Sequence, residues 1–315
     1  MRDIAVFSGS AHPELAAEVC ARLGVPLYPV RVSRFSTDCL EVQLQESCRE
    51  RDVFLIQPLV APVQENLVEL LLMLDAARGA SAARTTAVIP YFAYARSDKK
   101  DAPRISIAAR LVADLLATAG ANRVLTMTMH SPQFFSVPVD HLHALREMAA
   151  YFRRYDLSNA VAVSPDLGNV KEAAAFGRLL GIPAAAGAKE RYADDRVAIR
   201  SVIGDVAGKD VIVLDDEIAK GSTVLELLER LRERKVRSIR VACTHGLFAG
   251  GALKRLSEQP DIEEIVCTNT VPLPPGESGT VEKLTVLSVA PALAEAMRRI
   301  HNGQSVSALF HPEAA

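Results

Sequence analysis

The decisive stretch of the sequence reads Val211-Ile-Val-Leu-Asp-Asp-Glu-Ile-Ala-Lys-Gly-Ser-Thr223. Its apolar beginning predicts a strand, the adjacent acids Asp215 and Asp216 follow, and a short turn of small and polar residues comes next. From 224 to 235, leucines recur at helical spacing among charged residues, which predicts a helix. This order favours phosphate binding, because the turn and the helix start present backbone N–H groups. An ordinary polar connection is the alternative, since short loop motifs also match by chance.

The same stretch resembles the ribose-5-phosphate loop of type I phosphoribosyltransferases and of ribose-phosphate pyrophosphokinases (PRPP synthetases). The resemblance implies that ribose 5-phosphate binds at the two acids and the turn, namely Asp215, Asp216, Ala219, Lys220, Gly221, Ser222 and Thr223. The chain departs from the family at Ala219, where an acid is common, at Lys220, where Thr is usual, and at Ser222, where Gly is usual. Lys220 would add a cation beside the expected 5-phosphate.

Other blocks of the sequence resemble PRPP synthetases from end to end, in the family's order and near its spacing. They lie at 7–16, 34–36, 89–101, 116–120, 129–133, 163–166, 189–191, 242–245 and 304–310, so that the resemblance covers almost all of the 315 residues. It implies transfer of the pyrophosphoryl group of ATP to the C1 hydroxyl of ribose 5-phosphate, with PRPP and AMP as products. Such chemistry depends mainly on alignment and on neutralising charge on phosphate oxygens.

Strand and helix patterns alternate along the chain, which predicts an α/β fold with parallel sheets covered by helices on both faces. Strands are expected at 4–8, 53–57, 86–90, 124–129, 160–164, 211–214, 238–244 and 265–268, and helices at 67–78, 107–118, 170–180, 224–235 and 251–256. The resemblance implies two phosphoribosyltransferase type I-like domains, each a mostly parallel sheet flanked by helices. We expect them at 1–145 and 146–315, with a C-terminal tail able to pack on the first.

Two residues that follow predicted strands, His130 and Asp166, match the family's Mg²⁺–ATP ligands. A histidine nitrogen and a carboxylate oxygen can bind Mg²⁺ together with waters and phosphates. A surface loop histidine and a helix N-cap are the alternatives. Near these residues Thr128 replaces an Asp of the family and Asn169 replaces a Gly.

The charged segment around 188–196 contains Lys189 and Arg191, which match the family's catalytic residues in a flexible loop that closes on substrate. Arg can bind phosphate oxygens with two hydrogen bonds, and Lys acts as a mobile point charge. The alternative is a solvated loop, since the segment mixes charges of both signs.

The resemblance assigns ATP binding to Phe35, Glu41, Arg96, Lys99 and Arg104. In the family, Phe35 and Glu41 would reach the adenine pocket of a neighbouring subunit, where a ring can stack on the base and a carboxylate can accept from its amino group. A core or interface aromatic is the alternative for Phe35. The turn at 37–40 is longer than usual, which weakens the match at Glu41.

Residues far apart in the sequence match the family's allosteric site for phosphate and ADP, which lies between subunits. They are Ser47, Arg49, Ser81, Ser305, Ser307 and Phe310. Hydroxyls and a guanidinium are suitable phosphate donors. Helix caps, a surface arginine and an ordinary C-terminal strand are the alternatives. The resemblance implies a homo-oligomer, expected to be a hexamer, with ADP and phosphate as effectors.

The composition limits the partners. A net charge of −2 argues against a general nucleic-acid binder, and no apolar run is long enough to cross a bilayer. No secretory signal opens the chain, and the five cysteines form no C-x-x-C pair, which favours a reducing compartment. We therefore expect a cytoplasmic protein that binds neither nucleic acid nor membrane. The resemblance implies ATP and ribose 5-phosphate as its substrates and Mg²⁺ as its cofactor.

Two functions remain open from the sequence. The first is an active PRPP synthetase, favoured by the family residues retained at the expected metal, catalytic and ribose sites. The second is a non-catalytic regulatory homologue, possible for a divergent paralogue, which binds nucleotide and associates with PRPP synthetases; Thr128, Ala219 and Lys220 favour it. A phosphoribosyltransferase with a base acceptor is weaker, because it would leave the ATP motifs without a purpose.

Overall fold

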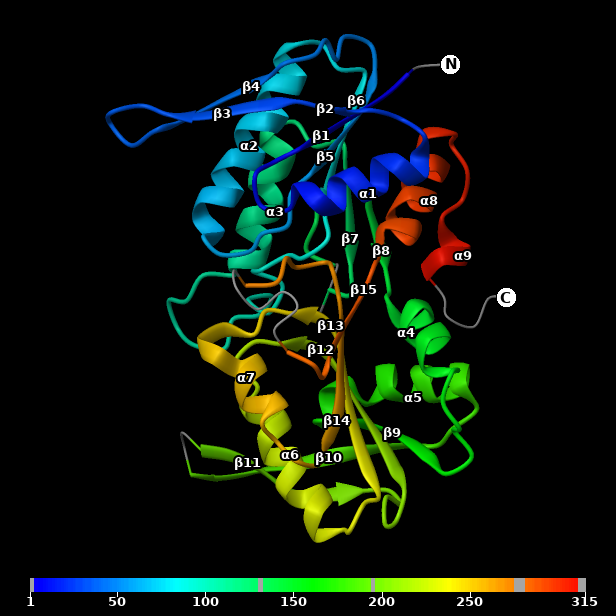
Figure 1. Ribbon diagram of the computed structural model, residues 1–315. Helices are drawn as coiled ribbons and strands as arrows, with labels where there is room; N and C mark the ends of the chain where they lie inside the picture. Colours follow the sequence, from blue (N-terminus) through cyan, green and yellow to red (C-terminus); the bar gives the residue numbers. More distant parts are fainter. Residues whose placement is uncertain (1–2, 130–132, 194–195, 275–280, 311–315) are drawn as a thin grey trace. The chain divides into compact units, whose positions relative to one another are not determined.

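A computed structural model describes residues 3–129, 133–193, 196–274 and 281–310 (Figure 1). At 189–193, 196–198, 200, 308 and 310 the description covers the backbone alone. The chain divides into two compact units. Unit 1 comprises residues up to His143 together with Thr270–Pro272 and Ser288–Phe310, and unit 2 comprises Ala144–Asn269 and Leu273–Leu287. The expected domain boundary at 145 stays a prediction, and the two units are treated separately below.

Unit 1 contains a six-stranded sheet in the order β2-β1-β5-β6-β7-β8, with all neighbours parallel. Its central strand β5 is buried at every position, and such strands read as continuous apolar runs because helices cover both faces. The strands are β1 (Ile4–Ser8), β2 (Leu27–Tyr28), β5 (Asp52–Ile56), β6 (Arg84–Ile89), β7 (Arg123–Met127) and β8 (Val139–Leu142).

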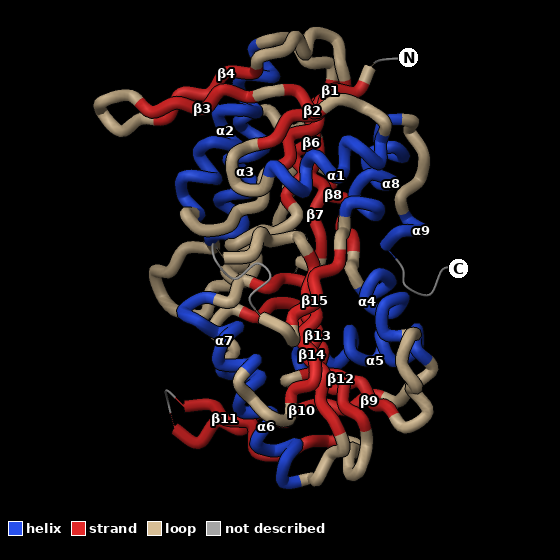
Figure 2. Tube along the Cα trace, viewed as in Figure 1, coloured by secondary structure: helices blue, strands red, loops and turns tan. Residues whose placement is uncertain are grey.

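Helices α2 (Val63–Gly79) and α3 (Ala108–Ala119) cover one face of this sheet, and α1 (Pro13–Leu23) packs beside α8 (Ala290–His301) on the other (Figure 2). The two faces follow from right-handed connections, because α1 connects β1 to β2 toward one edge of the sheet, whereas α2 and α3 connect β5, β6 and β7 toward the other edge. The short helix α9 (Ser307–Phe310) ends the described chain.

A separate antiparallel ribbon of β3 (Val30–Arg34) and β4 (Leu40–Leu44) extends from unit 1 (Figure 1).

Unit 2 contains a seven-stranded sheet in the order β11-β10-β9-β12-β13-β14-β15, parallel except where β11 pairs with β10. The strands are β9 (Ala160–Ser164), β10 (Ala184–Ala193), β11 (Arg196–Ile203), β12 (Asp210–Ile218), β13 (Ser238–Gly246), β14 (Ile262–Thr268) and β15 (Leu284–Leu287). The helices are α4 (Leu145–Phe152), η1 (Leu167–Asn169), α5 (Val170–Leu180), α6 (Ser222–Glu233), η2 (Ala249–Gly251) and α7 (Ala252–Ser257). The leucines spaced helically in the sequence lie on α6, where Leu228 and Leu231 are fully buried in the core.

The predicted α/β class with mostly parallel sheets is confirmed, and the strands at 4–8 and 160–164 and the helix at 170–180 have the predicted bounds. Two local expectations were wrong. Strand β12 continues to Ile218, so Asp215 and Asp216 lie within the strand, because it keeps pairing with β13 as far as Gly246. The charged segment expected as a loop is a β-hairpin, because β10 pairs with β11 through positions 189 and 191.

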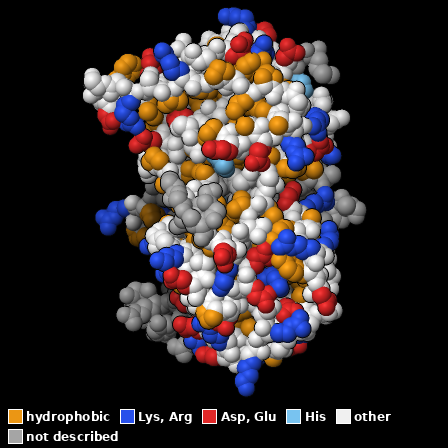
Figure 3. All heavy atoms as spheres, viewed as in Figure 1, with side chains coloured by type: hydrophobic (Ala, Val, Ile, Leu, Met, Phe, Trp, Pro, Cys, Tyr) orange, Lys and Arg blue, Asp and Glu red, His pale blue; other side chains and the backbone are white. Residues whose placement is uncertain are grey.

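Acidic and basic side chains are intermixed on the face shown in Figure 3, as the near-zero net charge suggests. Within the described ranges no helix combines the length and the hydropathy that crossing a membrane requires.

Candidate functional site

The connection from β12 to α6 in unit 2 has the geometry of an anion site. Gly221 lies at φ +73°, a left-handed conformation that costs little only for glycine, and it directly precedes α6. The helix begins there, because the Leu225 N–H donates to the Gly221 carbonyl at 3.0 Å. An α-helix leaves its first N–H groups without partners inside the helix, and its N-terminus is electropositive. The backbone at Ser222 and Thr223 therefore suits a phosphate.

Hydrogen bonds from the segment after β13 and from α7 also fix the backbone of this connection. Leu247 and Phe248 both donate their backbone N–H to the Ile218 carbonyl, each at 3.1 Å, and Arg255 donates to the Lys220 carbonyl at 2.8 Å. These bonds fix the backbone on both sides of Ala219. The Lys220 side chain is exposed, so its ammonium is free of packing contacts that would keep it from turning toward a bound anion.

The two acids of β12 are partly buried at the carboxyl end of the strand. Asp215 Oδ1 accepts the Asp216 N–H at 2.9 Å. This end of the sheet is where open α/β folds bind their ligands. The acids therefore lie directly before the turn at Gly221, as the sequence order required.

Asp166 lies at the end of the neighbouring strand β9, since Val163 and Val213 are partners in the β9–β12 register. Its Oδ1 accepts the N–H of Gly168 at 2.9 Å and of Asn169 at 3.2 Å, so the carboxylate caps η1. The capping interpretation of Asp166 is thus observed. Capping through one oxygen leaves metal binding untested, because a carboxylate has two oxygens with several acceptor positions.

Strand β10 passes close to the Asp166 turn at Gly187. A Cβ added there would lie 2.5 Å from the Pro165 carbonyl oxygen, so only glycine allows this approach. Gly187 is already part of the β10–β11 hairpin, which is paired from Ala186 onward, and Lys189 and Arg191 follow on the same strand. The side chains of Lys189 and Arg191 lie outside the described part of the structure.

Glu172, in the first turn of α5, is a site residue that the sequence analysis missed. Burial raises the pKa of its carboxyl from 4.5 to about 7, and the charge of Asp216 adds to the effect. Strongly shifted carboxyls are typical of functional sites. A possible sequence sign was that this acid lies six positions after Asp166, in the first turn of the helix that follows the same predicted strand.

The expected nucleotide residues of unit 1 lie in the long connection between β6 and α3. Arg96, Lys99 and Arg104 are all exposed, and Arg104 has φ +63°. Ser97 closes the connection onto the helix, because its hydroxyl accepts the Ala108 N–H at 3.3 Å and its carbonyl accepts the Ala109 N–H at 3.1 Å. The three cations thus belong to one surface loop with a fixed base.

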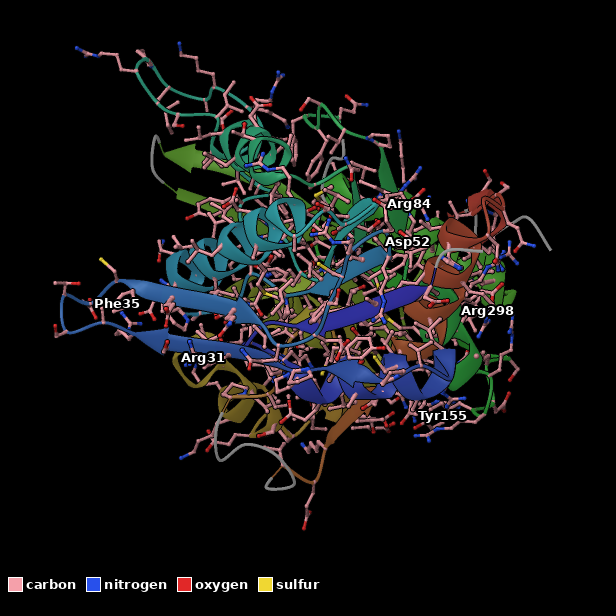
Figure 4. All side chains as sticks on the ribbon, turned by 90° about the horizontal axis from the view of Figure 1, so that it is seen from above. Arg31, Phe35, Asp52, Arg84, Tyr155 and Arg298 are labelled. Carbon is pink, nitrogen blue, oxygen red and sulfur yellow. The ribbon has the colours of Figure 1, made fainter. Side chains whose placement is uncertain are left out.

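Phe35 lies at the tip of the β3–β4 ribbon and is 54% exposed, which excludes a core position within unit 1 (Figure 4). Glu41 lies farther back on β4, where it accepts from the Ser33 hydroxyl at 2.7 Å and lies 3.6 Å from Arg31. The two residues therefore occupy different parts of the ribbon.

The expected effector residues of unit 1 fall into two groups. Ser47 and Arg49 are exposed in the connection before β5, and the neighbouring Glu50 donates its N–H to the Ser81 carbonyl at 2.9 Å. The hydroxyls of Ser305 and Ser307 lie 3.1 Å apart after α8. The Phe310 side chain is outside the described part of the chain.

The described residues contain no cluster of three metal-ligating side chains, and His130 lies outside them. The acids of unit 2 nevertheless fit a hard cation by their chemistry. Asp166, Asp215 and Asp216 supply carboxylate oxygens near the ends of two adjacent strands, and Mg²⁺ prefers one or two carboxylates together with water and substrate phosphates.

Comparison with known proteins identifies the family of the chain. A family model for the N-terminal domain of ribose phosphate pyrophosphokinase matches residues 4–120, and one for the phosphoribosyl synthetase-associated domain matches residues 191–311. A Streptomyces coelicolor protein provisionally named ribose-phosphate pyrophosphokinase is 77% identical over 98% of both chains. A Deinococcus radiodurans ribose-phosphate pyrophosphokinase is 48% identical over 97% of both chains.

A solved structure gives the same result. The crystal structure of phosphoribosylpyrophosphate synthetase from Mycobacterium smegmatis superposes with a TM-score of 0.89 at 38% identity, over 96% of this chain and 100% of that one. None of these comparisons supports the alternative of a non-catalytic homologue. The chain therefore belongs to the ribose-phosphate pyrophosphokinase family and is an enzyme of that class.

Proposed function

We propose that the chain joins ATP and ribose 5-phosphate at the residues identified above. In the reaction the C1 hydroxyl oxygen of ribose 5-phosphate forms a bond to the β-phosphorus of ATP, and the bond from that phosphorus to the α-phosphate oxygen breaks. AMP leaves with the bridging oxygen, and the hydroxyl proton is released. The observation that carries this proposal is the β12 acid pair followed by Gly221 and the start of α6.

The ribose 5-phosphate half of the site lies in unit 2. The 5-phosphate accepts hydrogen bonds from backbone N–H groups between Lys220 and Thr223, where the helix start favours an anion. Asp215 and Asp216 bind the ribose hydroxyls. Lys220 adds an ionic contact to the phosphate, which compensates for Ser222 in a turn where the family uses glycine.

The ATP half of the site uses Arg96, Lys99 and Arg104 on the β6–α3 connection. Phe35 and Glu41 contribute from a neighbouring subunit: an exposed ring at the end of a protruding ribbon is suited to stack on a base outside its own unit. Lys189 and Arg191 bind the charge that develops on the phosphate oxygens, which is how preorganised cations accelerate phosphoryl transfer.

Kinase-type enzymes of this class generally need a metal ion, and we propose Mg²⁺ held by His130 and Asp166. When bound, Mg²⁺ neutralises the phosphate charge of ATP. The contribution of this chain is the fixed Asp166 turn, whose backbone bonds to Gly168 and Asn169 orient the carboxylate.

The proposal extends to assembly and regulation. A homo-oligomer, expected to be a hexamer, would bring Phe35 to the neighbouring subunit. Phosphate and ADP would bind at Ser47, Arg49, Ser81, Ser305, Ser307 and Phe310. The cytoplasmic location remains a prediction.

The direct test is release of AMP from ATP by the purified protein, with and without ribose 5-phosphate and Mg²⁺. We expect AMP and PRPP to form in equal amounts only when all three are present. Nucleotide binding without AMP release would instead identify a regulatory homologue. The variant Asp216→Asn should lose ribose 5-phosphate binding, whereas Asp205→Asn, at an exposed ion pair with Lys209, is the matched control that should not.

A further inference from the structure

Aspartates near the amino ends of sheet strands are each paired with an arginine from a neighbouring strand or its entry. The nitrogen–oxygen distances are 2.8 Å for Arg84–Asp52, 2.5 Å for Arg123–Asp140 and 2.6 Å for Arg237–Asp210. All three aspartate side chains are at most 8% exposed. Buried charges require such partners, so the pairs alone have a structural explanation.

Asp52 differs because a distant histidine joins its pair. His301 Nδ1 lies 2.9 Å from Asp52 Oδ2, and the His301 side chain is only 10% exposed. Since a carboxylate paired with arginine only accepts, the histidine donates its Nδ1–H. Arg84 also donates to the Ile300 carbonyl at 3.0 Å. We call Asp52, Arg84 and His301 the C-terminal anchor.

The anchor joins the end of α8 to the starts of β5 and β6, all within unit 1. Figure 4 shows Asp52 and Arg84 beside each other on these strands. Further contacts fix the rest of α8 to α1: Ser288 donates to Glu18 and Arg298 donates to the Arg22 carbonyl. The helix is therefore held along its length, and the anchor is the attachment at its last turn.

Each member of the anchor lies a few positions from an expected effector residue. Arg49 precedes Asp52 by three positions, Ser81 precedes Arg84 by three, and Ser305 follows His301 by four. The ion pair and the hydrogen bond of the anchor do not require an effector residue three or four positions away. Nevertheless, such a residue is expected on each of the three segments, which are far apart in the sequence.

Backbone bonds connect the anchor to these segments. Ala83 donates to the Arg51 carbonyl at 2.9 Å, which joins the two strand entries. After α8, Gln304 donates to the Arg299 carbonyl at 2.8 Å, and Arg299 Nη1 donates to the Ser305 carbonyl at 3.1 Å. A movement of the last turn of α8 would therefore be passed to Ser305 through short, ordered contacts.

We infer that His301 is a positioning residue for the effector response: through Asp52 and Arg84 it fixes segment 302–307 relative to the entries of β5 and β6. The inference rests on the effector site of the proposed function. The ligand class is a phosphate-bearing anion, and the effect is on effector binding and not on turnover, because no member of the anchor is among the residues expected to bind ATP, ribose 5-phosphate or the metal ion.

His301 is the best position for the test, because removing it leaves the Arg84–Asp52 pair intact and keeps the buried charge compensated. His301→Ala removes the hydrogen bond, while His301→Asn keeps an amide donor able to reach Asp52. Ser238→Ala is the matched control, because the Ser238 hydroxyl donates to Asp210 at 2.8 Å as the third member of the Arg237 pair in unit 2.

The experiment measures kcat, the inorganic phosphate concentration for half-maximal activation, the ADP concentration for half-inhibition, and amide hydrogen exchange of 302–307. We expect His301→Ala to raise both effector concentrations about tenfold, as loss of a hydrogen bond to a charged group predicts. Exchange at 302–307 should become faster, while kcat at saturating substrates changes less than about twofold, within the span of small surface effects. His301→Asn should recover most of the wild-type response, and Ser238→Ala should match the wild type.

Wild-type effector concentrations in His301→Ala would overturn the inference, as would an equal shift in Ser238→Ala. A wild-type protein that makes PRPP without responding to phosphate or ADP would also overturn it, with the catalytic proposal left standing. If the wild type makes no PRPP, the catalytic proposal fails, and calorimetric affinities for ADP and phosphate decide the inference by the same comparison of variants.

Discussion

The two ends of the sheets use their carboxylates in opposite ways. At the amino ends, Asp52, Asp140 and Asp210 are each neutralised by an arginine side chain. At the carboxyl end in unit 2, Asp166 and Asp215 accept from backbone N–H groups, and burial, with a further contribution from the charge of Asp216, raises the pKa of Glu172. Paired charges stabilise a fold, whereas neighbouring like charges cost stability and are typical of ligand sites. We therefore expect the aspartates at the amino ends to matter for folding, and those at the carboxyl end to matter for substrate binding.

The largest expected effect concerns the β10–β11 hairpin. We expect Lys189→Ala and Arg191→Ala each to lower kcat by about 10²–10³ with little change in stability, because each removes a cation that acts in the transition state. Steady-state kinetics and thermal unfolding measure the two quantities. Lys209→Ala, at an ion pair with the exposed Asp205, is the control. Normal turnover in both variants would remove the hairpin from the mechanism.

The next prediction compares an aspartate at the amino end of β12 with one near its carboxyl end. Asp210→Asn should lower the free energy of unfolding by about 2 kcal/mol, less than for a fully buried pair because Arg237 is 59% exposed. Asp215→Asn should abolish ribose 5-phosphate binding with little loss of stability. Urea unfolding and calorimetric titration with ribose 5-phosphate provide the measurements. A large stability loss from Asp215→Asn would contradict the division between the two ends.

A smaller effect is expected at Glu172, and its size depends on pH. The folded-state pKa is raised to about 7, so the folded protein binds the proton more tightly than the unfolded chain does. The stabilising contribution of this group is full below about pH 4.5 and is lost as the pH rises through about 7. Glu172→Gln should therefore raise the free energy of unfolding by about 1–3 kcal/mol at pH 8 and leave it unchanged near pH 4.5.

Metal-free protein is required for that measurement, because a bound cation would lower the same pKa. Glu229→Gln, an exposed carboxyl on α6, is the control and should show no such pH dependence. A Glu172→Gln protein that is less stable at pH 8 would mean that the carboxylate form is favoured after all.

The smallest effect concerns Lys220. Lys220→Thr should raise the apparent KM for ribose 5-phosphate about fivefold and leave that for ATP nearly unchanged, as the loss of one exposed ionic contact predicts. Lys254→Thr, an exposed lysine on α7, serves for comparison. Equal changes for both substrates would mean that Lys220 acts elsewhere.

Much of the fold and the ribose loop follows from sequence because local patterns determine both. Buried parallel strands are continuous apolar runs, and the turn before α6 needs a glycine where Gly221 has φ +73°. The charged hairpin at Lys189 and Arg191 could not be predicted in this way, since its residues have no alternating pattern, although its partner strand β11 follows directly in the sequence.

Glu172 and the anchor were missed for a related reason. A carboxyl in the first turn of a helix normally faces solvent and stabilises the helix start. The pKa of Glu172 is raised only because the residue is buried near Asp216 of β12, a contact that the sequence does not reveal. Asp52 and His301 are 249 positions apart, and no spacing rule links them. Contacts between remote segments are what local sequence patterns cannot encode.

The assignment of Ser288–Phe310 to unit 1 has a consequence for synthesis of the chain on the ribosome. Helix α8 packs against α1 and contributes the buried residues Leu293 and Met297. Helix α1 is translated first, and the surface that α8 covers must wait until nearly the whole chain has been made. Unit 2 can complete its core in the interval, so the part that begins first finishes last. During translation, the surface of α1 that α8 will cover is the one most in need of protection against aggregation.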